Sequence, residues 1–135
     1  MNSKGVTMLT SNKILGFLQT TNSKRAKEFY IDVLGLQFSS EDQFALELNA
    51  GGNRLRISET KDFQAMPFTV LGWEVEDIDQ VTQGLKTKGV QFEFYSWMTT
   101  QSASGVWNSP SGARVAWFKD PDGNLLSLSQ HPAIS

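Results

Sequence analysis

Apolar and polar side chains alternate along several short segments, which is the pattern of strands that bury one face. In residues 43–48 the apolar side chains on one face are Phe44, Leu46 and Leu48. In residues 70–75 they are Leu71, Trp73 and Val75, and near the C-terminus Leu126 and Leu128 share a face in the same way. Each segment is therefore predicted to be a strand with one apolar face on a core and one mixed face.

A hairpin is predicted at residues 49–52, Asn-Ala-Gly-Gly, because Asn and Gly favour tight turns. With Asn49 opposite Gly52, apolar residues pair on one face and charged residues on the other. The predicted pairs are Leu46–Leu55, Phe44–Ile57, Glu47–Arg54 and Ala45–Arg56. A slip of one residue would mix the two faces, so the pattern determines which face each side chain takes.

Two other segments have apolar residues three and four positions apart, which predicts amphipathic helices. The first begins near Asn22 or Ser23, which suit an N-cap, and ends at Gly35, which suits the left-handed residue after a helix. The second begins at Asp77 and ends at Gly89. The apolar faces consist of Ala26, Phe29, Tyr30, Val33 and Leu34 in the first helix, and of Ile78, Val81 and Leu85 in the second.

The chain also repeats itself once, at an offset of about 55 residues. Leu-Gly-Phe at 15–17 and Gly-Leu-Gln-Phe at 35–38 correspond to Leu-Gly-Trp at 71–73 and Gly-Val-Gln-Phe at 89–92. We therefore predict a single α+β domain over residues 1–135, built from two βαβββ modules at about 13–60 and 68–131. Their mixed sheets are expected to curve into a cup, with the helices on the outer face.

Composition removes several classes of function. The formal net charge is −2, and no basic stripe suits nucleic acid. No apolar run approaches the roughly 20 residues of a membrane span, and the N-terminus lacks the apolar segment of a secretory signal, so we expect a cytoplasmic protein. There is no Cys, and the single His, His131, is interpreted as a solvated tail residue. Neither a His-rich metal site nor a Ser–His–Asp triad is expected.

The mixed faces of the two modules form the predicted ligand site. Its candidate residues on the strands are Phe17, Gln19, Glu47, Arg54, Arg56, Glu74, Arg114 and Ser127. A partly buried Arg56 needs a partner such as Glu47 or Glu74, because an unpaired buried charge is costly. One interpretation is a charge network that only holds the cup together. The other is that Arg54 or Arg56 receives an anionic or carbonyl group of a ligand.

Residues 95–112 are rich in Ser, Thr, Gly and Asn and predict a long loop of the kind that often forms a binding loop. Trp97 and Trp107 in this loop either stack on a flat ligand or anchor the loop. Strand parity places Trp73 in the core but does not decide which face of its strand Trp117 takes. We assign no catalytic residue, because each carboxylate in the cup has an Arg partner that would lower its basicity.

Two motifs resemble the vicinal oxygen chelate superfamily, which contains glyoxalases, bleomycin-resistance proteins and extradiol dioxygenases. One is residues 26–36, with Phe29-Tyr30 followed by Leu-Gly-Leu at 34–36, and the other is Asp-Pro-Asp-Gly-Asn at 120–124. The resemblance extends from about Lys13 to Gln130 and implies two βαβββ modules that close into a cup. It also implies a homodimer, because single chains of this size in the family usually share their cups.

The catalytic members of that superfamily bind a divalent metal with His, Gln or Glu from the first and last strand of each module. The resemblance places these four positions at Leu15, Arg56, Val70 and Ser127. Leu and Val offer no donor, Arg is a cation, and Ser alone is a weak ligand. Shifting the alignment by two residues brings Gln19 or Glu74 nearer but restores no set of three. We therefore expect no metal and no other cofactor.

Three hypotheses of function remain. The leading one is a homodimer that binds a small organic ligand, flat and aromatic or anionic, without a metal, as in the drug-sequestering branch of the family. The second is a metal-dependent enzyme of the glyoxalase or dioxygenase type with an atypical site. The third is a structural or regulatory dimer whose cup is vestigial.

Overall fold

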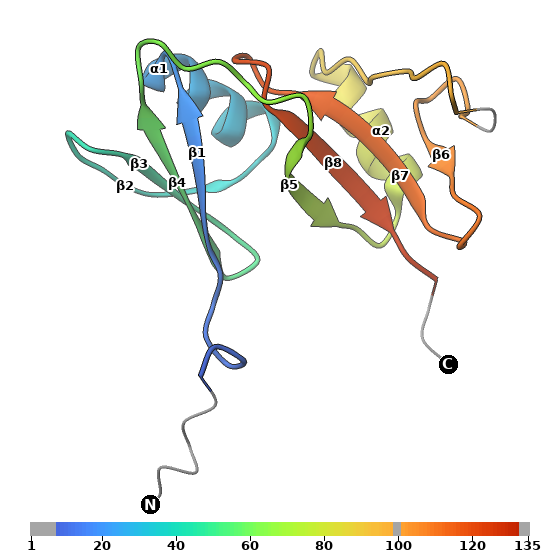
Figure 1. Ribbon diagram of the computed structural model, residues 1–135, viewed down its shortest axis with the longest axis horizontal. Coiled ribbons are helices and arrows are strands. Elements are labelled where there is room, and N and C mark those ends of the chain that lie inside the picture. Colours follow the sequence, from blue (N-terminus) through green and yellow to red (C-terminus); the bar gives the residue numbers. More distant parts are fainter. Residues whose placement is uncertain (1–7, 99–100, 133–135) are drawn as a thin grey trace, which may run out of the picture.

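Two four-stranded mixed sheets and two helical regions make up residues 8–98 and 101–132, which the computed structural model describes (Figure 1). The first module consists of β1 (Leu15–Thr20), α1 (Ser23–Lys27), η2 (Glu28–Val33), β2 (Gln37–Glu41), β3 (Leu46–Ala50) and β4 (Asn53–Glu59). The second consists of β5 (Thr69–Glu74), α2 (Ile78–Thr87), β6 (Trp107–Asn108), β7 (Arg114–Lys119) and β8 (Leu125–Gln130). This order confirms the predicted α+β fold of two βαβββ units.

Both sheets have the same topology, as an internal repeat requires. The strand order is β1-β4-β3-β2 in the first sheet and β5-β8-β7-β6 in the second. In each sheet the first strand pairs in parallel with the last, and the other pairs are antiparallel. Strands β1 and β5 therefore lie at the outer edges of their sheets, where one side of each has no neighbouring strand among the described residues.

The β3–β4 hairpin has a register two residues away from the predicted one. Leu48 pairs with Leu55 and Glu47 with Arg56, so Asn49 lies opposite Arg54 and not opposite Gly52. The turn is formed by Gly51 and Gly52, whose φ angles of 58° and 83° are both positive. Two-residue hairpin turns with positive φ at both central positions match the twist of the strands, and glycine adopts them without strain. A shift of two residues leaves Leu46, Glu47 and Leu48 on their predicted faces. The prediction for Phe44 is wrong, because Phe44 lies before β3, is 69% exposed and does not pair with Ile57, whose partner is Leu46.

The two helical regions start and stop where the sequence indicates. The Asn22 side chain accepts a hydrogen bond from the Arg25 N–H at 3.0 Å, and the Asp77 side chain accepts one from the Gln80 N–H at 3.1 Å. Gly35 and Gly89 follow the helices with φ angles of 81° and 94°. The first region widens into the π-helical segment η2 after α1, which the apolar spacing alone does not distinguish from a continuous α-helix.

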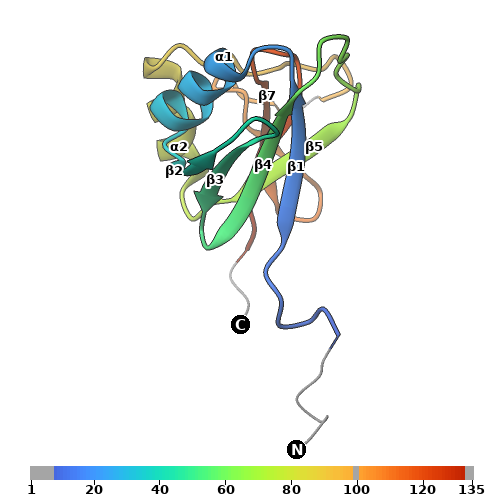
Figure 2. The ribbon, with the colours of Figure 1, turned by 90° about the vertical axis from the view of Figure 1, so that its left-hand side faces the viewer.

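The apolar faces of both sheets pack together with the helices into one core. Its members include Leu18, Tyr30, Leu46, Leu48, Leu55 and Ile57 from the first module, and Ile78, Ala116, Phe118, Leu126 and Leu128 from the second. The opposite face of each sheet, called here its open face, points outward. Figure 1 looks onto the second sheet, and Figure 2, turned to the left-hand side of that view, looks onto the first. The two open faces therefore lie on different sides of the molecule.

The turn between β7 and β8 holds the two modules together. The Asp122 carboxylate accepts hydrogen bonds from the Thr20 hydroxyl, from the Thr21 N–H and hydroxyl at 2.9 and 2.6 Å, and from Arg25 Nη2 at 3.0 Å. The buried Tyr30 hydroxyl donates to Asp120 at 2.7 Å. Burial, followed by the negative charge of Asp120, raises the pKa of Tyr30, so this hydroxyl keeps its proton. The motif that carried the family resemblance is thus the bridge between the modules.

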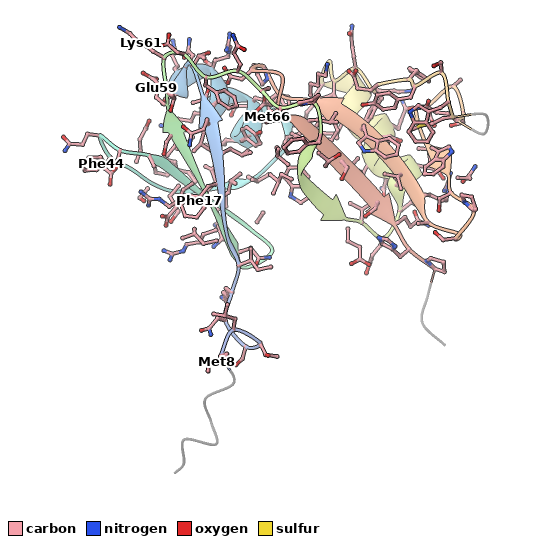
Figure 3. All side chains as sticks on the ribbon, in the orientation of Figure 1. Met8, Phe17, Phe44, Glu59, Lys61 and Met66 are labelled. Carbon is pink, nitrogen blue, oxygen red and sulfur yellow. The ribbon has the colours of Figure 1, made fainter. Side chains whose placement is uncertain are left out.

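Residues 60–68 connect the modules along the surface (Figure 3, where Lys61 and Met66 are labelled). Most of these residues are exposed. Among the described residues, no helix is long and apolar enough to cross a membrane.

Candidate functional site

A buried carboxylate between two arginines occupies the open face of the first sheet. Glu47 is only 8% exposed, although its side chain lies on the solvent side of β3. Its Oε1 accepts a hydrogen bond from Arg56 Nη1 at 2.8 Å, and its Oε2 accepts one from Arg54 Nη1 at 3.1 Å. We call Arg54, Glu47 and Arg56 the arginine–glutamate clamp.

The strand register explains the clamp. Glu47 lies directly opposite Arg56 on β4, and Arg54 is two residues further along the same face, at the diagonal position that a long side chain reaches. Two guanidinium groups share one carboxylate, so the clamp carries a net positive charge. The side chains of Arg54 and Arg56 remain 58% and 31% exposed, which leaves guanidinium donors available to a further acceptor.

The neighbours of the clamp come from β1 and from the end of the hairpin. Phe17 lies beside Arg56 in the parallel pair and is 65% exposed (Figure 3). Gln19, on the same face, accepts a hydrogen bond from the Thr60 hydroxyl. A cavity of about 280 Å³ adjoins the clamp, and its lining includes Lys13, Asn49 and Arg54. Two of these three side chains are cationic, so the cavity suits an anionic group.

Four aromatic rings in mutual contact occupy the open face of the second sheet. We call Tyr95, Trp97, Trp107 and Trp117 the aromatic cluster. Ring centroids lie 6.0 Å apart for Tyr95–Trp97, 5.5 Å for Trp97–Trp107, 6.0 Å for Trp107–Trp117 and 5.8 Å for Tyr95–Trp117. Trp97 is 63% exposed, so its ring is open to solvent.

Strand pairing brings these rings together from distant parts of the sequence. Trp107 on β6 pairs with Val115, which places it diagonally next to Trp117 on β7. The Glu93 N–H donates to the Trp117 carbonyl at 2.8 Å, so the chain leading to Tyr95 runs beside the same strand. Burial, with a smaller contribution from the negative charge of Glu93, raises the pKa of Tyr95, so its hydroxyl stays neutral near pH 7.

Small residues and one acidic side chain lie between the aromatic cluster and the outer edge of β5 on this open face. Ser127 lies between Trp117 and Gly72, and Ser129 lies between Val115 and Glu74. A Cβ atom at Gly72 would sit 2.5 Å from the Ser127 hydroxyl oxygen, so the glycine makes room for the serine. Within the part of the chain that the structure describes, the exposed Glu74 carboxylate has no ion pair or hydrogen bond.

The structure brings the predicted residues together in two groups and not in one. Phe17, Gln19, Glu47, Arg54 and Arg56 share the first open face, while Glu74, Trp97, Trp107 and Ser127 share the second. Arg114 lies on neither. It binds Asp79 of α2 through Nη1 and Nη2 at 2.8 and 2.9 Å, on the helix side of β7. Trp73 packs against the core beside Phe118, as strand parity predicts.

Sequence reasoning missed Tyr95 and Trp117, which complete the aromatic cluster. Residues 115–118 are all apolar, so alternation in the sequence does not decide which face Trp117 takes, and only the burial of Ala116 and Phe118 in the structure shows that it takes the other one. Tyr95 precedes any regular element, so no periodicity assigned its face. Lys13 was also missed, since it lies just before β1 in an exposed segment.

The donor set does not fit the metal that the family resemblance implies. Residues 8–98 and 101–132 contain no group of three or more His, Cys, Asp or Glu that could hold an ion. Leu15 pairs with Arg54, whereas Phe17 is the residue beside Arg56. On β5, Gly72 lies opposite Ser127, while Val70 sits at an irregularity of the strand pairing. Neither the aligned positions nor their neighbours supply a set of carboxylate or imidazole ligands, and the clamp would repel a cation.

Comparisons with known proteins give a consistent result. Residues 11–128 match the Glyoxalase/Bleomycin resistance protein/Dioxygenase superfamily. The chain is 29% identical over 127 residues to the uncharacterized protein YraH of Bacillus subtilis (strain 168), covering 82% of this chain and 91% of that protein.

Solved structures share the fold at low sequence identity. A member of the same superfamily from Sphaerobacter thermophilus superposes with a TM-score of 0.72 at 19% identity, covering 92% of this chain and 100% of the other. A lactoylglutathione lyase from Agrobacterium tumefaciens gives a TM-score of 0.69 at 15% identity, with 89% and 93% covered. A glyoxalase family protein from Enterococcus faecalis gives 0.68 at 23% identity, with 90% and 99% covered.

Proposed function

Because the chain belongs to the glyoxalase/bleomycin resistance protein/dioxygenase superfamily, we propose that it uses this fold to bind a small organic molecule and not a metal ion. The observation that carries the proposal is the arginine–glutamate clamp. It consists of two guanidinium groups around one buried carboxylate, and one of the two belongs to Arg56, for which the resemblance implies a metal-ligand position. A fixed net positive charge there disfavours a cation and favours an anion.

The ligand of this proposal is a flat molecule with an anionic group. The guanidinium donors left exposed on Arg54 and Arg56 suit a carboxylate, which a planar Arg group binds through two parallel hydrogen bonds. The exposed Phe17 ring beside Arg56 supplies an apolar contact for the body of the ligand. Lys13 in the adjoining cavity adds a further positive charge.

We further propose that a second copy of the chain completes the site. The two open faces of one chain point to different sides of the molecule, so one chain alone does not enclose a ligand between them. The outer edges of β1 and β5 have no strand partner within residues 8–98 and 101–132, and unpaired strand edges favour pairing with another chain. The arginine–glutamate clamp gives the first open face a positive group, and the second carries Glu74, which has no ion pair among the described residues, so these groups are complementary in charge.

The test of binding compares a flat carboxylate with its neutral analogue. Isothermal titration with 2-naphthoate and with 2-naphthalenemethanol is expected to show binding of the carboxylate at least about tenfold tighter. Arg56→Ala is expected to remove this preference while the protein stays folded, because Glu47 keeps Arg54 as a partner. Arg114→Ala is the matched control, since Arg114 lies on the helix side. Equal affinity for both probes, or equal loss in both variants, would contradict the proposal.

Two further measurements decide between the proposal and its alternatives. Elemental analysis of the purified protein tests the metal-dependent enzyme, and stoichiometric Ni, Zn, Mn or Fe would overturn the proposal. Light scattering tests the second copy. Phe17→Lys, on the first open face, is expected to weaken the dimer. Phe44 is about as exposed but lies outside the arginine–glutamate clamp, and Phe44→Lys is expected to leave the dimer unchanged. A dimer that persists in both variants, with no binding of either naphthalene probe, would favour a purely structural role.

A further inference from the structure

The aromatic cluster has a feature that an anionic ligand does not explain. Its four rings form a closed circuit, in which each ring contacts two others at centroid distances between 5.5 and 6.0 Å. The exposed Trp97 belongs to this circuit and is not packed away as a loop anchor. Two of these contacts are edge to face, at 84° for Tyr95–Trp117 and 76° for Trp97–Trp107, so the rings do not all present a flat side outward. Where the exposed Trp97 presents its flat side, the negative charge density there produces a negative local potential.

The charged groups near the cluster add to this negative potential. Residues 69–79, which include β5 at the edge of the same sheet, contain four carboxylates and no Lys or Arg. One of them, Glu74, lies on the open face and has no hydrogen bond or ion pair with any residue that the structure describes. Lys119, on the same strand as Trp117, has the Glu93 carboxylate 3.8 Å from its Nζ atom. Arg114 is held by Asp79 on the opposite side of the sheet.

From this arrangement we propose that the aromatic cluster binds the flat, positively charged ring of an organic cation, with Glu74 as the counter-charge. The inference deepens the proposed function, on which it rests, by naming the chemistry of the second part of the ligand. A cation over a tryptophan ring is attracted by the charge distribution of the ring, and a delocalised flat cation also stacks on it. Together with the clamp on the first open face, the site then suits a zwitterion with a carboxylate at one end and a cationic ring at the other.

The residues between the rings and Glu74 are small, which leaves room for the cation there. Ser127 and Ser129 on β8 separate the aromatic cluster from Gly72 and Glu74 on β5. Neighbouring strands lie about 4.8 Å apart, and Glu74 is two residues along β5 from Gly72, the residue in line with Trp117, so the backbone positions of Trp117 and Glu74 are roughly 12 Å apart. A bicyclic cation over Ser127 and Ser129 therefore reaches from the aromatic cluster toward the Glu74 carboxylate, with only short side chains beneath it.

The experiment uses two probes of nearly equal shape, N-methylquinolinium and quinoline, at pH 7.5. Binding is followed by quenching of tryptophan fluorescence and by calorimetry. The expected result is that N-methylquinolinium binds roughly tenfold more tightly than quinoline. Trp73 is packed against the core, so part of the emission is expected to remain at saturation.

Variants assign this preference to the proposed residues. Trp107→Leu and Trp97→Leu are each expected to weaken N-methylquinolinium by at least about fivefold. Glu74→Gln is expected to lower the preference for the cation over quinoline to roughly threefold or less, while quinoline itself binds as before. Glu76→Gln is the matched control, because it removes the same charge two residues away and is expected to leave the preference unchanged.

The outcomes separate this inference from the function on which it rests. If 2-naphthoate binds through Arg56 but N-methylquinolinium shows no advantage over quinoline, the cation site is refuted and the anion site stands. If N-methylquinolinium binds with the expected dependence on Trp107 and Glu74 while 2-naphthoate does not bind, the cation site stands and the arginine–glutamate clamp is only structural. If no probe binds, both proposals are refuted. Equal effects of Glu74→Gln and Glu76→Gln would also overturn the role of Glu74.

Discussion

Replacing Asp122 tests whether one turn holds the two modules together. In Asp122→Ala the Thr20 hydroxyl, the Thr21 N–H and hydroxyl, and Arg25 all lose their acceptor. Thr20 is 1% exposed and the Asp122 side chain 2%, so this loss is not fully replaced by water. A buried hydrogen bond to a charged group contributes about 1.5–3 kcal/mol, and each contact from the exposed Thr21 and Arg25 adds less than about 1 kcal/mol.

We therefore expect Asp122→Ala to lower the free energy of unfolding by about 3–4 kcal/mol at pH 7. That is a large part of the roughly 5–15 kcal/mol by which a domain is stable. Asp122→Asn keeps one acceptor oxygen and is expected to lose roughly half as much. Asp62→Ala, in the exposed connection between the modules, serves as the control and is expected to change stability by less than about 0.5 kcal/mol. Urea unfolding followed by circular dichroism measures all four proteins.

The difference in the free energy of unfolding between wild type and Asp122→Ala also depends on pH, and this dependence gives a second test. Burial alone would raise the pKa of Asp122, but the hydrogen bonds from Thr20 and Thr21 and the charge of Arg25 outweigh it and hold the pKa below its usual value. A carboxyl with a lowered pKa in the folded state contributes stability above its unfolded pKa of about 3.9, and this contribution is lost as the pH falls through the lower, folded value. The difference between wild type and Asp122→Ala is thus expected to be constant from about pH 8 to 5 and to shrink below about pH 4. A difference below about 0.5 kcal/mol at pH 7, or one that is the same at pH 3, would refute the reasoning.

The remaining predictions concern stability and use the same urea assay. Leu48→Ala, at a fully buried core position, is expected to cost about 2–5 kcal/mol, and a loss below about 1 kcal/mol would mean that the core is misassigned. Gly51→Ala is expected to cost only about 1 kcal/mol, because its φ of 58° is strained for alanine but its surroundings are open. Gly105→Ala is expected to cost clearly more, since its Cβ would lie 2.7 Å from Phe92 Cβ; equal costs at the two glycines would contradict that contact. Asn22→Ala removes the helix cap and is expected to cost about 1 kcal/mol, whereas Asn22→Asp is expected to retain most of the stability.

The sequence was sufficient to predict the faces of the strands but not their pairing. Alternation has a period of two, so Leu46, Glu47 and Leu48 keep their faces in both the predicted and the observed register of the hairpin. The choice between these registers depends on which two residues form the turn. Gly51 and Gly52 both adopt positive φ, and that preference outweighs the turn through Ala50 that was predicted.

The site was predictable residue by residue but not as an arrangement. Strand parity placed Glu47, Arg54 and Arg56 on one face because each lies in a regular strand. The contact of Tyr95 and Trp97 with Trp117 depends on how an irregular segment runs beside β7, and no local pattern encodes that path. The outward direction of both open faces depends on the packing of one module on the other, which alternation within single strands does not determine.

The exposed connection at residues 60–68 has a consequence for the integrity of the chain. A single cut there would sever the backbone but leave the shared core and the Asp122 contacts intact. The core and these contacts both join residues before the cut to residues after it. Each half alone would expose the apolar face that the other half now covers, so neither is expected to remain folded in isolation. When the two fragments are mixed, they are expected to reassemble into the folded protein. The protein would then serve as a pair of complementing fragments, in which the return of the folded state reports that the two fragments have met.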